Sequence, residues 1–99
     1  MNGLIANPPD DAALPALIDP AVLDAAERAM SANSWRALRA DLGVFSQWAA
    51  QRGAATLPSA PATVAAFLRD QAKAGKKAAT LARYASSIAR AHALANLRA

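Results

Sequence analysis

Arginine is the residue type in this chain that could do chemistry, because it alternates with small side chains on two predicted helical faces. At 100° per residue, Arg36 and Arg39 lie opposite the apolar stripe of one helix, together with Ala40, Gly43 and Gln47. On a later helix, Arg83 and Arg90 share the outer side with Ala79, Ser86 and Ser87. Arginine donates paired hydrogen bonds to a phosphate or a guanine edge, and small neighbours let a helix lie close to its partner. The two faces favour contact with a nucleic acid.

A face that meets only solvent is the alternative for these arginines. Such faces usually alternate Glu with Lys at four-residue spacing, and that mixture is missing here. Asp41 is the only acidic residue near either face. The body of the chain is also strongly basic, since residues 32–99 hold ten Lys and Arg against Asp41 and Asp70. Residues 1–31 hold five acidic residues against Arg28 alone, so the asymmetry suggests an anionic partner for the body.

Few residues in the sequence could support other kinds of chemistry. The chain has no cysteine, one histidine (His92) and one glutamate (Glu27), which excludes thiolate metal sites and paired-glutamate hydrolysis. There is no Ser/His/Asp set, no glycine-rich phosphate loop and no acidic metal cluster, and nothing near Tyr84 would activate it as a nucleophile. We therefore predict binding rather than catalysis, with no catalytic residue, no metal and no cofactor.

The elements that position these faces are predicted to be helices. The chain has 99 residues, enough for one domain, and its 30 alanines favour helix over strand. Capping and breaking residues predict helices over residues 20–30, 33–53, 61–75 and 78–94. We expect an all-α bundle of four helices, antiparallel or orthogonal, or of five if residues 14–18 form a short ordered piece. Residues 1–18 are predicted to be a flexible arm, and residues 19–99 the helical domain.

The apolar residues recur at three- and four-residue steps and predict the inner faces. They are Trp35, Leu38, Leu42, Phe45, Trp48 and Ala49, then Val64, Phe67 and Leu68, then Leu81, Tyr84, Ile88, Ala91 and His92. Both tryptophans fall on this stripe, so core packing is favoured over stacking on bases. Ser34 is interpreted as a helix N-cap, and Lys76-Lys77 as the turn before the last helix. No run is apolar enough to span a bilayer, and no signal peptide is evident, which predicts a soluble cytoplasmic protein.

The order of these motifs resembles a known family. Residues 33–48, NSWRALRADLGVFSQW, are similar to the S-x-x-T-W…F-x-x-W helix of tyrosine recombinases of the phage-integrase type. Leu57-Pro58, the segment PATVAAFL at residues 61–68, a turn at Gly75 and the helix from Ala79 to His92 follow in the same order. Residues 20–97 thus resemble the N-terminal core-binding, SAM-like domain of that family.

This resemblance implies a DNA-binding role. In the family, this domain lies on one face of the recombination site and the catalytic domain closes on the other, with the second and fourth helices in the major groove. By the resemblance, Ser34 and Arg36 lie near the DNA backbone, Ala37 near bases, and Arg83 is the best candidate for reading a base. Ala79 replaces a DNA-contacting lysine of the family, a contact that Lys77 could supply. The predicted DNA-binding residues are Ser34, Arg36, Ala37, Arg39, Lys77, Thr80, Arg83, Ser87 and Arg90.

The resemblance also implies partners. Double-stranded DNA is the first, and residues 20–30 match a helix that packs on other recombinase protomers, although we expect the isolated domain to be a monomer. The family's catalytic domain would begin where this chain stops, so we expect a piece of a longer recombinase or a naturally short protein. A helical protein–protein interaction module with a basic surface, or a regulatory DNA-binding protein without a recombinase parent, remains an alternative.

Overall fold

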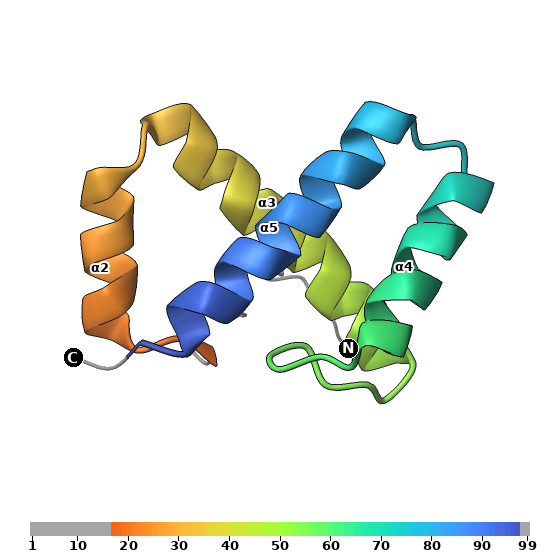
Figure 1. Cartoon of the computed structure of the whole chain (residues 1–99), viewed down its shortest axis with the longest axis horizontal. Helices are drawn as coiled ribbons and strands as arrows, with labels where there is room; N and C mark the ends of the chain where they lie inside the picture. Colours follow the sequence, from red (N-terminus) through yellow and green to blue (C-terminus); the bar gives the residue numbers. More distant parts are fainter. Residues whose placement is uncertain (1–16, 98–99) are drawn as a thin grey trace, which may run out of the picture.

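The computed structural model describes residues 17–97, and over that range it consists of helices and loops with no strand. The helices are α2 (Pro20–Ala29), α3 (Ala32–Gln51), α4 (Pro61–Lys73) and α5 (Ala78–Ala95). In Figure 1, α3 and α5 cross near the centre of the molecule, with α2 to one side and α4 to the other. The predicted all-α class with four helices is confirmed. Most of the predicted arm, residues 1–16, lies outside the described residues.

Side-chain caps determine where the first two of these helices begin. Asp19 accepts a hydrogen bond from the backbone N–H of Ala21 at 2.9 Å, which caps α2 as the Asp19-Pro20 pair predicts. Ser31 caps α3, because its hydroxyl accepts from the N–H of Ser34 at 3.1 Å. The prediction that Ser34 is the N-cap is therefore wrong. Ser34 lies in the first turn, and its hydroxyl accepts a hydrogen bond from Ser31 at 2.9 Å.

The two following turns depend on glycine. Gly53 comes just after α3 with φ of 65°, and Gly75 follows α4 with φ of 98°. Side chains with a Cβ avoid this left-handed conformation, so glycine is the residue that ends a helix here at little cost. Both helix ends fall where the sequence predicts them.

The apolar core has two parts, one on each side of the helix crossing. The part near α2 contains Ile18, Trp35, Leu38, Leu42 and Ala91. The part near α4 contains Phe45, Phe67, Tyr84 and Ile88. Phe45 and Phe67 meet edge to face with ring centroids 5.0 Å apart, a favoured aromatic geometry. Since α3 and α5 contribute to both parts, these two helices form the frame of the domain.

The inner surface of α3 is wider than a single stripe. Asp41, Leu42 and Gly43 are consecutive and all buried, because α2, α4 and α5 all pack against α3. The predicted outward position of Gly43 is therefore wrong. The outward position predicted for Ser87 is wrong as well, since only 8% of this residue is exposed at the crossing. Ile18, at the end of the predicted arm, is 3% exposed and belongs to the core.

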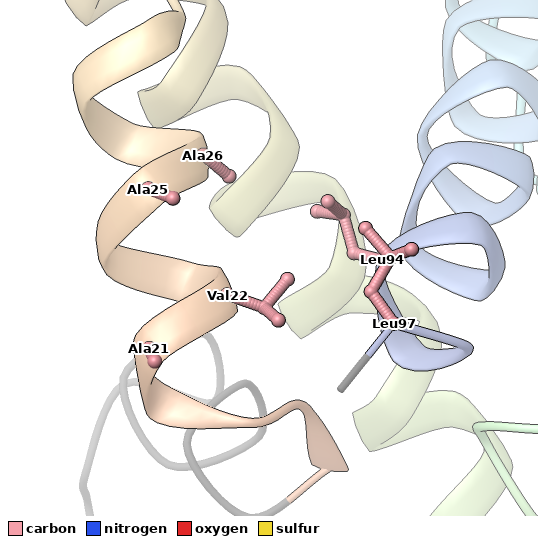
Figure 2. A pocket seen from close by; sticks show the side chains of 6 residues that line it. All are labelled: Ala21, Val22, Ala25, Ala26, Leu94 and Leu97. Atoms are coloured by element: carbon pink, nitrogen blue, oxygen red, sulfur yellow. The ribbon is translucent and has the colours of Figure 1, made fainter. Parts of the chain in front are cut away.

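An apolar hollow of about 430 Å³ lies between α2 and the C-terminal end of α5 (Figure 2). It is lined by Ala21, Val22, Ala25, Ala26, Leu94 and Leu97. Leu97 is 54% exposed and lies beside the other apolar residues of this hollow. The hollow therefore leaves apolar surface on α2 and α5 exposed to solvent within the described part of the chain.

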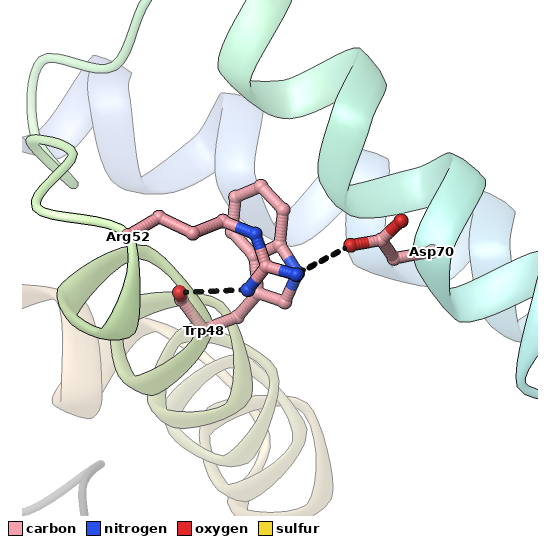
Figure 3. Close-up of polar contacts among 3 residues, drawn as sticks. All are labelled: Trp48, Arg52 and Asp70. Carbon is pink, nitrogen blue, oxygen red and sulfur yellow. Dashed lines mark hydrogen bonds and ion pairs between the residues drawn. The ribbon is translucent and has the colours of Figure 1, made fainter.

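A polar cluster connects the end of α3 to α4 (Figure 3). The indole N–H of Trp48 donates to Asp70 Oδ2 at 3.0 Å, and Arg52 Nη2 donates to the same oxygen at 2.8 Å. The guanidinium of Arg52 also lies over the Trp48 ring, with Cζ 4.2 Å from its centroid. These three side chains hold the two helices together at the edge of the core.

His92 attaches the loop between α3 and α4 to α5. The backbone N–H of Ser59 donates to His92 Nε2 at 3.0 Å, and His92 Nδ1 lies 2.8 Å from the carbonyl of Ile88. An amide N–H can only donate and a carbonyl can only accept, so the ring proton must be on Nδ1. The predicted inner, half-buried position of His92 is confirmed.

Candidate nucleic-acid interface

Residues of α3 and α5 that are far apart in the sequence meet at one shallow hollow of about 220 Å³. It is lined by Ser34, Ala37, Leu38, Arg83, Ser86, Ser87 and Arg90. Five of the nine predicted DNA-binding residues are in this set. We call the surface formed by Ser34, Ala37, Arg83, Ser86 and Arg90 the α3–α5 face.

The floor of this face holds a buried carboxylate. Asp41 is 2% exposed and accepts two hydrogen bonds from Arg83, from Nε to Oδ2 at 3.1 Å and from Nη2 to Oδ1 at 3.0 Å. Ser87 donates a third, from its hydroxyl to Oδ2 at 2.7 Å. A buried carboxylate is costly unless its oxygens are paired, and here both oxygens are paired. Ser87 thus serves the carboxylate beneath the face.

Arg83 joins this buried carboxylate to the surface. Its side chain is 55% exposed although two of its nitrogens bind Asp41. The hydrogen bonds that Arg83 donates to Asp41, followed by the negative charge of that carboxylate, raise the pKa of Arg83 above its ordinary value. The guanidinium therefore carries its charge throughout the pH range in which proteins are studied.

The two predicted arginines of α3 lie at a neighbouring hollow toward α2. Arg36 and Arg39 line it together with Glu27, Met30, Ala32 and Trp35, and its volume is about 360 Å³. Arg36 is exposed, and its Nη1 donates to Asn33 Oδ1 at 3.0 Å. The structure therefore divides the predicted residues of α3 between two hollows, with Ser34 and Ala37 at one and the two arginines at the other.

Lys77 and Thr80 lie at the beginning of α5. Lys77 is exposed and occupies the N-cap position of α5, as the predicted Lys76-Lys77 turn implies. Thr80 is half-buried in the first turn, three residues before Arg83. Neither residue lines the hollow of the α3–α5 face. They extend the predicted set along α5 toward its N-terminus.

Asp41 is the functional candidate that the sequence reasoning missed. It lies three residues after Leu38 and four before Phe45, so it falls on the apolar stripe itself. A charged residue on such a stripe indicates a buried partner, and Arg83 and Ser87, four residues apart on one helix, are suitable donors. The spacing was visible in the sequence, but which helix faces this part of α3 was not.

Neither a metal-binding group nor a membrane-spanning helix is found among the described residues. Over residues 17–97, no three His, Asp or Glu side chains come together as a group that could hold a metal ion. None of the four helices is both long enough and apolar enough to cross a membrane. What the α3–α5 face presents is a shallow surface of arginine donors and small side chains, which can hydrogen bond a flat, acceptor-rich partner.

Comparison with known proteins assigns the domain. Residues 25–98 match the family model described as phage integrase, N-terminal SAM-like domain. No curated protein and no solved structure gives a significant match. The family match covers most of the chain and all of α3, α4 and α5, in agreement with the resemblance of their motifs and with the helical fold. The chain therefore belongs to the N-terminal SAM-like domain family of phage integrases.

Proposed function

We propose that this domain binds duplex DNA through the α3–α5 face, as the DNA-binding part of a site-specific tyrosine recombinase. The observation that carries the proposal is the convergence of Ser34, Ala37, Arg83 and Arg90 on one hollow from two helices. Family membership supports the same conclusion, because such domains belong to integrases. In this proposal the domain works in the cytoplasm and has no catalytic role of its own.

The chemistry of the flanking residues supports contact with the DNA backbone. Arg36 and Arg90 are exposed, and Lys77 is exposed at the beginning of α5. Exposed cations on both sides of a shallow face can pair with phosphates on either side of a groove. We propose that Ser34, Arg36, Arg39, Lys77, Thr80 and Arg90 lie along the backbone, and that Ala37 and Arg83 lie nearer the bases.

Binding to DNA is tested with a labelled duplex of about 30 base pairs, long enough to cover one small domain with margin. We expect the logarithm of affinity to fall with the logarithm of salt with a slope of roughly −4 to −5, for about 4–6 phosphate contacts. Fluorescence anisotropy over a salt series measures it. Absence of binding at low salt would contradict the proposal.

Matched variants identify the face. Arg36→Ala and Arg90→Ala each remove one charge from the proposed surface and should weaken binding to all sequences alike, with a shallower salt slope. Arg69→Ala removes the same charge from an exposed position on α4, away from the α3–α5 face. If the Arg69 variant weakens binding as much as the other two, binding depends on net charge and not on this face.

The apolar hollow beside α2 supports a second proposal about partners. We propose that α2 contacts a neighbouring recombinase protomer, as the family resemblance of residues 20–30 implies, with Val22 and Leu97 at the contact (Figure 2). Val22→Asp should then prevent two domains from binding cooperatively to a duplex with two adjacent sites, and leave binding to a single site unchanged. Cooperativity that survives this change, measured by titration in gel shifts, would place the contact elsewhere.

A further inference from the structure

The pairing of Arg83 leaves one edge of its guanidinium for a ligand. Arginine has a side edge formed by Nε and Nη2 and an outer edge formed by Nη1 and Nη2. Asp41 binds the side edge with both of its oxygens. Nη1 has no partner in the described part of the chain, and the side chain is 55% exposed. Asp41 therefore fixes the guanidinium through its side edge, and the outer edge is open to a ligand.

The charge of this pair differs from that of the other arginines on the surface. Asp41 and Arg83 together are formally neutral, whereas Arg90 and Arg36 have no ion pair among the contacts of residues 17–97. A neutral pair attracts a phosphate less than an isolated cation does, because the carboxylate repels the anion. Two parallel N–H donors in a fixed plane suit two neighbouring neutral acceptors instead, and guanine presents O6 and N7 in this arrangement in the major groove.

We propose that Asp41 is a positioning residue that holds Arg83 with its outer edge toward a guanine, which makes this pair the determinant of sequence preference on the α3–α5 face. The inference rests on the proposed binding of duplex DNA. Ser87 assists, since its hydroxyl binds the same carboxylate at 2.7 Å and restrains it from below. Flexible side chains lose rotamer freedom on binding, and an arginine that is already fixed loses less of it.

In this proposal the arginines of the surface have two different roles. Arg36 and Arg90 would attract any duplex, and Arg83 would discriminate among sequences. Loss of the carboxylate should therefore have opposite effects on the two properties. It removes a negative charge from beneath the α3–α5 face, which favours binding to duplex in general, and it releases Arg83, which lowers discrimination.

The test selects binding sites from a pool of duplexes with a randomised centre, using the whole chain. We expect the natural sequence to enrich a site in which one G·C pair is preferred by about tenfold or more. Asp41→Asn and Arg83→Lys should each reduce that preference to about twofold or less. Retention of the full preference by either variant overturns the proposal.

A matched control separates the positioning of Arg83 from the loss of a negative charge elsewhere in the domain. Asp70→Asn removes the same charge from another carboxylate that joins two helices, away from the face. It should leave the selected sequence unchanged. If it lowers the preference for the G·C pair as much as Asp41→Asn does, the effect comes from the change in total charge, and the proposed role of Asp41 is wrong.

A measurement on the unmodified protein covers the case in which Asp41→Asn fails to fold. Replacing the guanine of the selected site by 7-deazaguanine removes N7 and leaves the backbone intact. We expect about tenfold weaker binding, and equal affinity for the two duplexes would overturn the inference. Failure to bind any duplex at low salt would instead overturn the proposed function, so the two failures are distinguishable.

Discussion

Within residues 17–97, the pairs Asp41–Arg83 and Asp70–Arg52 each join two helices, and these two pairs differ in how much water reaches them. In the pair at the crossing of α3 and α5, Asp41 is 2% exposed and Arg83 is 55% exposed. In the pair between α3 and α4, Asp70 is 38% exposed and Arg52 is 47% exposed. The distances are similar, at 3.0 Å and 2.8 Å. The two pairs have the same chemistry in different surroundings.

Exposure decides what each pair contributes. Water can replace Arg52 at Asp70, and Trp48 would still donate to that carboxylate (Figure 3). Asp41 is closed off from water, so the loss of Arg83 would leave a buried charge with Ser87 as its remaining donor. The Arg52–Asp70 pair adds to a contact that has other support. The Arg83–Asp41 pair is needed to keep its own carboxylate buried. Stability should therefore depend much more on Arg83 than on Arg52.

The largest expected effect is that of Arg83→Ala. Removing one partner of a buried pair leaves an uncompensated charge, so we expect the free energy of unfolding to fall by about 3 kcal/mol. Arg52→Ala, the matched change in the exposed pair, should cost less than about 1 kcal/mol. Urea denaturation of both variants measures the difference. Equal losses would mean that burial of Asp41 does not distinguish the two pairs.

A smaller effect is expected from Trp48→Phe. This change keeps an aromatic ring against Phe67 and removes the indole N–H that binds Asp70. We expect a loss of about 1 kcal/mol in the free energy of unfolding, the ordinary contribution of one such hydrogen bond. In a double-mutant cycle with Asp70→Ala, which removes both acceptor oxygens, the two losses should be less than additive. Full additivity would show that the hydrogen bond contributes nothing.

The smallest expected effect is that of salt. Raising the ionic strength to about 0.5 M screens charges at the surface and affects buried ones much less. The cost of Arg52→Ala should therefore decrease by a few tenths of a kcal/mol, and that of Arg83→Ala should stay nearly constant. Urea denaturation at low and high salt gives both values. A larger salt effect at Arg83 would indicate that Asp41 is reached by solvent.

The sequence predicts the helices of this domain well, because their signals are local. Asp19 caps α2, Gly53 and Gly75 follow α3 and α4, and the tryptophan stripe faces the core. The site is less predictable, because a helical wheel assigns each helix one inner face. Three helices pack on α3, so Gly43 is buried outside the predicted stripe. The partners of Asp41 depend on the crossing of α3 with α5, which no local pattern in the sequence specifies.

The proton on His92 offers a spectroscopic consequence of the loop attachment. With Nδ1 protonated and Nε2 accepting from Ser59, the ring is fixed in a single tautomer. The protonated and unprotonated ring nitrogens have different NMR shifts, so the shifts identify the tautomer. Because His92 is the only histidine in the chain, its labelled ring reports on the attachment of the loop. Its signal would tell whether the segment between α3 and α4 stays docked on α5 while the α3–α5 face binds a ligand.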